Sequence, residues 1–145
     1  MESQLETTYR IGIIQAQAYR RLQNHYRAAL KPYQLSVPEW SLLGIVIDTG
    51  SMTPSELAKA LKSKVSHPSA LIGRLEKRGL LQRDANGGDK RSTRVSLTPA
   101  GRKLIPAIET HVRTKLCGDL DDLSTTELSA YFKLLSKLAK GMEDE

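Results

Sequence analysis

The sequence predicts a mainly α-helical fold with one small β-hairpin, and three observations predict it. Apolar residues recur every three or four positions near both ends of the 145-residue chain, as on one face of a helix. A Ser or Thr precedes a Glu by three residues at three helix starts. One stretch near the middle has strand-forming residues on both sides of an Asn-Gly-Gly turn. The 39% of hydrophobic residues supplies enough apolar material for a core, and the length excludes a large catalytic barrel.

Helix starts are marked by capping boxes, in which a Ser or Thr side chain and a Glu side chain three residues later each accept a bond from the other's backbone N–H. The chain has three such pairs: Ser36 with Glu39, Thr53 with Glu56 and Ser124 with Glu127. The first opens a helix that runs to Gly50, the second a short helix and the third the last helix. Before them, an apolar stripe from Ile11 to Ala29 predicts a helix that ends near Pro32.

One stretch is predicted to form strands. Residues 80–83 and 93–97 flank the sequence DANGGDKRS, in which Asn86-Gly87-Gly88 tolerates the positive φ angles of a tight turn. The two segments therefore predict a β-hairpin. Thr98 and Pro99 then cap another long helix, which Pro106 is expected to bend near its middle.

Positive charge is concentrated in the middle of the chain, whose net charge is +6. Residues 59–103 hold twelve basic and three acidic groups, whereas residues 1–58 hold five of each and residues 104–145 hold five basic and eight acidic ones. Within this basic segment the predicted order of elements is helix, turn, helix and hairpin, which is the order in a winged helix-turn-helix domain. Such a domain places its second helix in the major groove of DNA and its hairpin tip in the minor groove. The alternative is a solvated basic face on a helical protein.

Three runs in this segment, SELAKALK, LIGRLEKRGLLQRD and GGDKRSTRVSLTPAGRKL, resemble the DNA-binding domain of the MarR/SlyA family of bacterial transcription regulators. The most specific part is the wing signature Asp89-Lys90-Arg91, followed by Val95, Leu97, Thr98 and Gly101. The resemblance implies a winged helix-turn-helix DNA-binding domain over residues 36–103. It also implies N- and C-terminal dimerisation helices over residues 1–35 and 104–145. The protein would then be a homodimer that regulates transcription, usually as a repressor, at a pseudo-palindromic operator in double-stranded DNA.

The segment before the recognition helix departs from the family pattern, because Lys62-Ser63-Lys64-Val65-Ser66 stands where relatives usually have Gly-Val-Ser. We place the N-cap at Ser66 and Gly79 just past the end, with Leu71, Ile72 and Leu75 facing the core. The residues predicted to form the DNA interface are Lys62, Lys64, Ser66, His67, Ser69, Arg74, Arg83, Asp89, Lys90, Arg91 and Arg94. Arg91 would enter the minor groove, oriented by Asp89. Lys62, Lys64, Ser66, His67 and Ser69 would form the recognition set, with a solvent-facing helix cap as the alternative for His67. Arg83, Lys90 and Arg94 would contact phosphates or remain solvated surface charges, and Arg74 would have either a structural or a phosphate role.

The resemblance also implies a site for a small aromatic or phenolic acid near the junction of the first two helices. The candidates there are His25, Tyr26, Tyr33 and Trp40, which are equally compatible with core packing. No cofactor or metal is expected, since the three histidines show no HxxxH or HExxH spacing. The single Cys117 has no resolving cysteine in the chain, so a buried or tolerated thiol is favoured over an oxidant sensor.

Both terminal helices carry apolar stripes too large for a lone winged domain to cover. The candidates for the dimer interface are Ile11, Ile14, Leu128, Phe132 and Leu135. No membrane segment or leader is predicted, so we expect a cytoplasmic protein associated with the bacterial nucleoid. An enzyme is not expected, because nucleophile-elbow, Walker and HExxH motifs are absent. The alternative function is a winged-helix module that docks on proteins and binds DNA without sequence preference.

Overall fold

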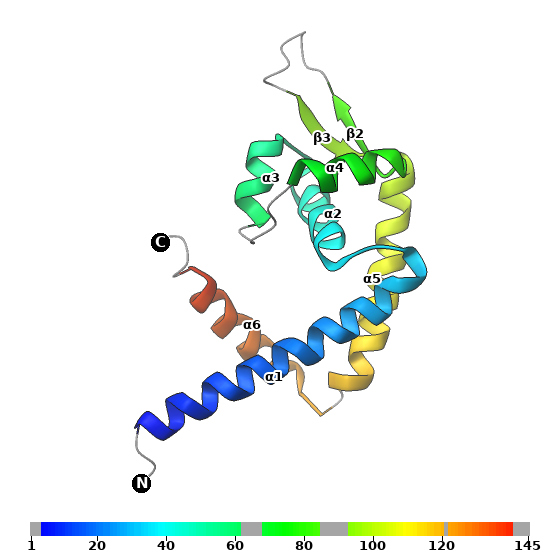
Figure 1. Ribbon diagram of the computed structural model, residues 1–145. Helices are drawn as coiled ribbons and strands as arrows, with labels where there is room; N and C mark the ends of the chain where they lie inside the picture. Colours follow the sequence, from blue (N-terminus) through cyan, green and yellow to red (C-terminus); the bar gives the residue numbers. More distant parts are fainter. Residues whose placement is uncertain (1–3, 62–67, 85–92, 121, 141–145) are drawn as a thin grey trace. The chain divides into compact units, whose positions relative to one another are not determined.

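The computed structural model describes residues 4–61, 68–84, 93–120 and 122–140, and the side chains of 7–61, 68–84, 93–116 and 122–140 (Figure 1). The chain forms two compact units, one up to Val112 and one from Arg113. It is mainly helical with a small antiparallel sheet, as predicted. The elements are α1 (Gln4–Leu30), the 3-10 helix η1 (Lys31–Tyr33), α2 (Val37–Thr49), β1 (Ser51–Met52), α3 (Pro54–Leu61), α4 (Pro68–Lys77), β2 (Leu81–Asp84), β3 (Arg94–Leu97), α5 (Pro99–Leu120) and α6 (Thr125–Lys140).

Two of the three predicted capping boxes form with both of their bonds, the third forms with one, and the starts of α2, α3 and α6 are confirmed. In the first box the Ser36 N–H donates to Glu39 Oε2 at 3.0 Å, and the Glu39 N–H donates to Ser36 Oγ at 3.2 Å. Thr53 and Glu56 repeat both bonds at the same distances. At α6 the Glu127 N–H donates to the Ser124 side chain at 3.1 Å. These bonds satisfy backbone donors that the first turn of a helix leaves unpaired.

The sheet has three strands in the order β1-β3-β2, whereas the sequence predicted only the β2–β3 hairpin. In that hairpin Leu81 lies opposite Leu97. The additional strand β1 places Ser51 opposite Ser96 on the other edge of β3. This strand escaped prediction because two residues show no alternation of their own, and only the distant partner strand makes them pair.

The core of the first unit lies among α2, α4, α5 and the sheet. Leu71, Ile72 and Leu75 of α4 are buried, as predicted. They are joined in the core by side chains from the neighbouring elements, which include Leu30, Leu42, Leu43, Val46, Leu57, Val95 and Ile108. The one-sided burial of α4 leaves its other face exposed. None of the helices in the described ranges is long and apolar enough to cross a bilayer.

The turn between α4 and β2 is closed by Gly79, just past the end of the helix as predicted. Gly79 has a φ of 71°, which suits a residue without a Cβ. Its N–H donates to the Glu76 carbonyl at 2.9 Å, and the Leu80 N–H donates to the Leu75 carbonyl at 3.0 Å. This pair of bonds is a Schellman motif. The motif ends α4 and leads the chain directly into β2, so the start of this strand follows from the end of the helix.

Thr98 connects the same turn to the start of α5. Its hydroxyl donates to the Gly79 carbonyl at 2.5 Å and accepts from the Gly101 N–H at 3.0 Å. Gly101 is buried there, and a Cβ at this position would overlap the Leu80 carbonyl oxygen. The end of the recognition helix, the wing strand and α5 therefore meet at one closely packed point. Farther along, Pro106 lies inside α5.

Candidate nucleic-acid interface

The outer face of α4 is the natural candidate to contact DNA. Ser69 and Ala70 are exposed and Gly73 is half-buried, while the opposite face of the helix is buried. Small residues on this face let the helix backbone approach a groove closely. Figure 1 shows α4 beside the paired strands β2 and β3, which extend from the same end of the unit.

Two predicted interface arginines are held by acidic side chains of the protein itself. Arg74 of α4 lies with its Nε 3.3 Å from Glu39 Oε1, so the recognition helix is tied to the start of α2. Arg83 of β2 donates from its Nε to Glu76 Oε1 at 2.7 Å, which ties the wing strand back to α4. Both arginines stay on the surface, with 62% and 44% of the side chain exposed.

Arg94, a third predicted interface residue, joins β3 to β1 and α3. Its Nε donates to Ser51 Oγ at 3.0 Å, and its Nη2 donates to the Ser51 carbonyl at 2.9 Å. The same Nη2 lies 3.7 Å from Glu56 Oε2. On the other side of β3, the buried Ser96 hydroxyl donates to Asp84 Oδ2 at 2.9 Å. Side chains of β3 therefore bond this strand to both neighbouring strands, to β1 through Arg94 and to β2 through Ser96.

The remaining predicted DNA contacts lie outside the described residues, namely Lys62, Lys64, Ser66, His67, Asp89, Lys90 and Arg91. The predicted N-cap of the recognition helix, Ser66, is among them, and the described helix begins at Pro68. Within residues 36–103, five exposed cations have no acidic partner in the described part of the chain: Lys59, Lys77, Arg78, Arg102 and Lys103.

Sequence reasoning missed Arg78, which bonds the end of α4 to the segment after α1. Its Nη1 donates to the Gln34 carbonyl at 2.8 Å and its Nη2 to the Tyr33 carbonyl at 2.6 Å. It also missed the second role of Glu39 and Glu56, which the sequence marks only as helix caps. The partners in each case are distant in sequence, so no local pattern signals these bonds.

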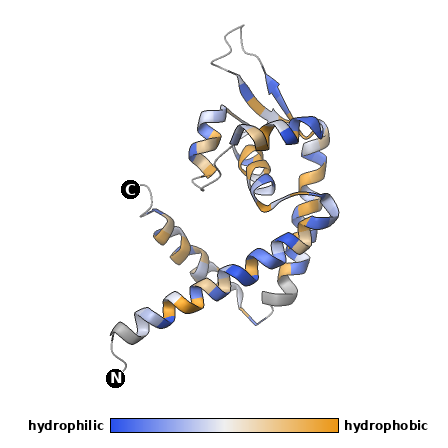
Figure 2. Ribbon diagram, in the orientation of Figure 1, coloured by the Kyte–Doolittle hydropathy of each residue, from blue (hydrophilic) through white to orange (hydrophobic). Residues whose placement is uncertain are grey.

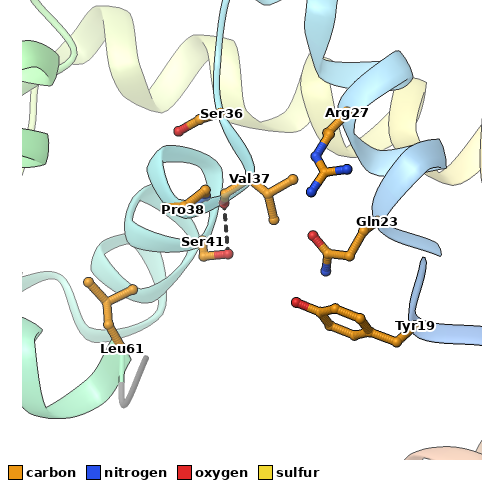
Figure 3. A pocket seen from close by; sticks show the side chains of 8 residues that line it. All are labelled: Tyr19, Gln23, Arg27, Ser36, Val37, Pro38, Ser41 and Leu61. Atoms are coloured by element: carbon orange, nitrogen blue, oxygen red, sulfur yellow. Dashed lines mark hydrogen bonds between the residues drawn. The ribbon is translucent and has the colours of Figure 1, made fainter. Parts of the chain in front are cut away.

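A cavity of about 500 Å³ lies between α1 and the start of α2 (Figure 3). Tyr19, Gln23 and Arg27 project into it from α1. The other lining residues come from the start of α2 and the end of α3: Ser36, Val37, Pro38, Ser41 and Leu61. An arginine, an amide and a phenol around one space provide polar groups that suit a small organic anion.

The four predicted ligand residues are close in sequence to residues that line this cavity, but they do not line it themselves. The Tyr26 and Trp40 rings contact each other with centroids 5.3 Å apart. Tyr33 contacts His111 edge-on at 5.7 Å, and His25 is half-buried on α1. Trp40 lines a second hollow of about 530 Å³, between α2 and α5, together with Gly44 and Ile105.

Exposed apolar side chains are concentrated on α1 and α6. Figure 2 shows hydrophobic residues along the ribbons of both helices. On α1, Ile11 is 60% and Ile14 62% exposed. On α6, Phe132 is 73% and Leu135 42% exposed, and Leu128 is half-buried. Such side chains lose contact with water only when another surface covers them.

Metal and redox chemistry find little support in the described residues. No group of three His, Cys, Asp or Glu side chains there is arranged to hold a metal ion. The side chain of Cys117 lies outside the described set, so the prediction of a tolerated thiol stays a prediction.

The sequence of this chain is similar to those of known transcriptional regulators. The MarR family model matches residues 35–93. The uncharacterized HTH-type transcriptional regulator YfiV of Bacillus subtilis is 29% identical over 110 residues, which cover 76% of this chain and 69% of YfiV.

Two solved structures have a similar fold. A probable transcriptional regulator from Pseudomonas aeruginosa has a TM-score of 0.75 and 30% identity, over 88% of this chain and 96% of its own. A mutant MarR from E. coli, complexed with operator DNA, has a TM-score of 0.77 and 20% identity, over 94% of this chain and 99% of its own.

Proposed function

The chain belongs to the MarR family, and from this premise we propose that it acts as a homodimeric repressor at a pseudo-palindromic operator. As a member of that family it is a DNA-binding transcriptional regulator and not an enzyme. The observation that carries the proposal is the one-sided burial of α4, a helix that lies beside β2 and β3 in the most basic segment of the chain.

In the proposed complex, residues 36–103 form the DNA-binding domain. The N-terminal part of α4 enters the major groove, where Ser69 and the preceding Ser66 and His67 can hydrogen-bond base edges. The adjacent Lys62 and Lys64 contact phosphates. At the wing tip Arg91 enters the minor groove, with Asp89 orienting it and Lys90 on a phosphate. Arg74, Arg83 and Arg94 belong to the same surface.

A second copy of the chain is proposed to cover the apolar side chains of the terminal helices, residues 1–35 and 104–145. The exposure of Ile11, Ile14, Phe132 and Leu135 supports this, because a stable dimer needs an apolar interface of this kind. A two-fold dimer presents two recognition helices about 34 Å apart to successive major grooves, so the operator has matching half-sites. Such a complex forms on the nucleoid, in the bacterial cytoplasm.

Small aromatic acids are proposed as effectors that release the operator. The cavity beside Arg27 supports this, since a guanidinium binds a carboxylate in two parallel bonds and Tyr19 offers an aromatic face. A ligand there contacts both α1 and α2, so it can bias the spacing of the two DNA-binding domains and thereby change operator affinity. A titration with salicylate, followed by Trp40 fluorescence, should saturate for the wild type and weaken for Arg27→Ala. A linear, non-saturable response contradicts the effector site.

The assembly is tested by sedimentation of the protein alone and with a duplex selected from a randomised library. We expect two chains in the free protein and two chains on each duplex, with related half-sites in the selected sequence. A monomer that binds all duplexes equally contradicts the proposal and favours the winged-helix interaction module.

A further inference from the structure

We propose that Glu39 and Glu56 are positioning residues for DNA binding, which act through Arg74 on the recognition helix and Arg94 on the wing strand. The inference rests on the proposed function, because it concerns how the two DNA-contacting elements are held. Each glutamate caps its own helix and also binds an arginine from an element that faces DNA.

Glu39 is suited to this double role because its two oxygens have different partners. Oε2 accepts the Ser36 N–H at 3.0 Å, and Oε1 lies 3.3 Å from Arg74 Nε. The residue is only 7% exposed, so its carboxylate depends on protein partners in place of water. Arg74, whose side chain is 62% exposed, reaches this oxygen from the surface of α4. The ion pair therefore joins the recognition helix to the first turn of α2.

Glu56 does the same for the wing. Its Oε2 accepts the Thr53 N–H at 3.0 Å and lies 3.7 Å from Arg94 Nη2. Arg94 is held further by Ser51, through the side-chain oxygen and the backbone carbonyl. Two hydrogen bonds and one ion pair therefore hold this guanidinium against β1 and the first turn of α3.

The third capping box supplies a contrast. At the start of α6 the Glu127 N–H donates to Ser124 Oγ and the Ser124 hydroxyl donates to Glu127 Oε1, yet within the described ranges Glu127 has no basic partner. Pairing with an arginine is therefore not a general consequence of a capping box. It occurs in the two boxes whose helices lie against the recognition helix or the wing.

Positioning and phosphate binding by these arginines predict different salt dependences. An arginine that binds a phosphate releases a counterion, so the plot of log affinity against log salt becomes shallower by about one when it is lost. An arginine that only orients an element leaves this slope unchanged. It acts on the discrimination between the preferred duplex and random DNA, because base contacts depend on the angle of the recognition helix.

The test uses Glu39→Gln and Glu56→Gln, because Gln at this position still completes a capping box while the charge that holds the arginine is lost. Binding is titrated between about 50 and 200 mM salt, against the selected duplex and random DNA. We expect each variant to lose three- to tenfold in discrimination with an unchanged slope. Glu127→Gln, which removes the same charge from α6, should match the wild type.

A double-mutant cycle tests whether Glu39 acts on DNA binding through Arg74. If Glu39 acts through Arg74, the double variant Glu39→Gln, Arg74→Gln should discriminate no worse than Arg74→Gln alone. Unchanged discrimination in Glu39→Gln and Glu56→Gln overturns the inference. So does tighter binding with a steeper slope, since the arginines would then be phosphate contacts held back by the glutamates. A wild type that prefers no duplex overturns the proposed function itself.

Discussion

Gly101 lies where α5 passes the turn between the recognition helix and the wing, and replacing it with Ala should destabilise the protein. A Cβ there would overlap the Leu80 carbonyl oxygen and lie 3.2 Å from both Leu80 C and Leu97 Cδ2. The Leu80 backbone cannot retreat freely, since its N–H donates to the Leu75 carbonyl and its own carbonyl accepts from the Thr98 N–H.

The expected change in the free energy of unfolding is the sum of three contributions. Overpacking costs about 1–3 kcal/mol. Weakening the bond from the Thr98 N–H to the Leu80 carbonyl, now 3.1 Å, costs about 1 kcal/mol more. The higher helix propensity of Ala returns about 0.8–1 kcal/mol. We therefore expect a net loss of about 1–3 kcal/mol, which lowers Tm by roughly 3–10 °C in a chain of this length.

The assay is thermal unfolding followed by circular dichroism at a fixed protein concentration, because the Tm of the proposed dimer would depend on concentration. Gly44→Ala is the matched control, since Gly44 is also helical and a Cβ there meets nothing within 4 Å. The control should be as stable as the wild type or slightly more stable. If Gly101→Ala behaves like Gly44→Ala, the close approach of α5 to the turn is refuted.

The other predictions concern the ends of helices and the dimer. Gln34→Gly should raise stability by about 1 kcal/mol, because Gln34 has a φ of 53° that costs a residue with a Cβ; an unchanged Tm would contradict this strain. Thr98→Val should lose about 1–2 kcal/mol in denaturant unfolding, since the Gly79 carbonyl and the Gly101 N–H both lose a partner; a neutral effect would mean that water replaces the hydroxyl. Phe132→Asp should convert the dimer to monomers in sedimentation while far-UV circular dichroism stays unchanged, and a dimer that persists would exclude this face of α6 from the interface.

The parts of the fold that the sequence predicts correctly are those that depend on residues close together in the chain. Each capping box uses residues three apart, so the sequence alone located the starts of α2, α3 and α6. Gly79 marked the end of α4 for a similar reason, because only the local backbone decides where a positive φ is needed. The buried face of α4 followed from its helical period.

Long-range pairing accounts for what the sequence did not predict. The strand β1 forms because its two residues pair with the free edge of β3, and nothing in those two residues alone predicts this pairing. The sequence predicts Arg74 and Arg94 as DNA contacts, but their partners Glu39 and Ser51 within the protein come from distant segments. The sequence predicts a ligand site at His25, Tyr26, Tyr33 and Trp40, but it does not predict the cavity beside Arg27 and Gln23, because the position of that cavity depends on how α1 and α2 pack.

The most direct test of the central claim is a salt-controlled binding titration. The protein is titrated against the DNA upstream of its own gene and against random duplex of equal length, over the same salt series. A sequence-specific regulator should prefer the upstream DNA by about a thousandfold or more, with both affinities falling as salt rises. Equal, salt-sensitive binding to the two duplexes would contradict the account, because it would leave a basic winged fold without an operator.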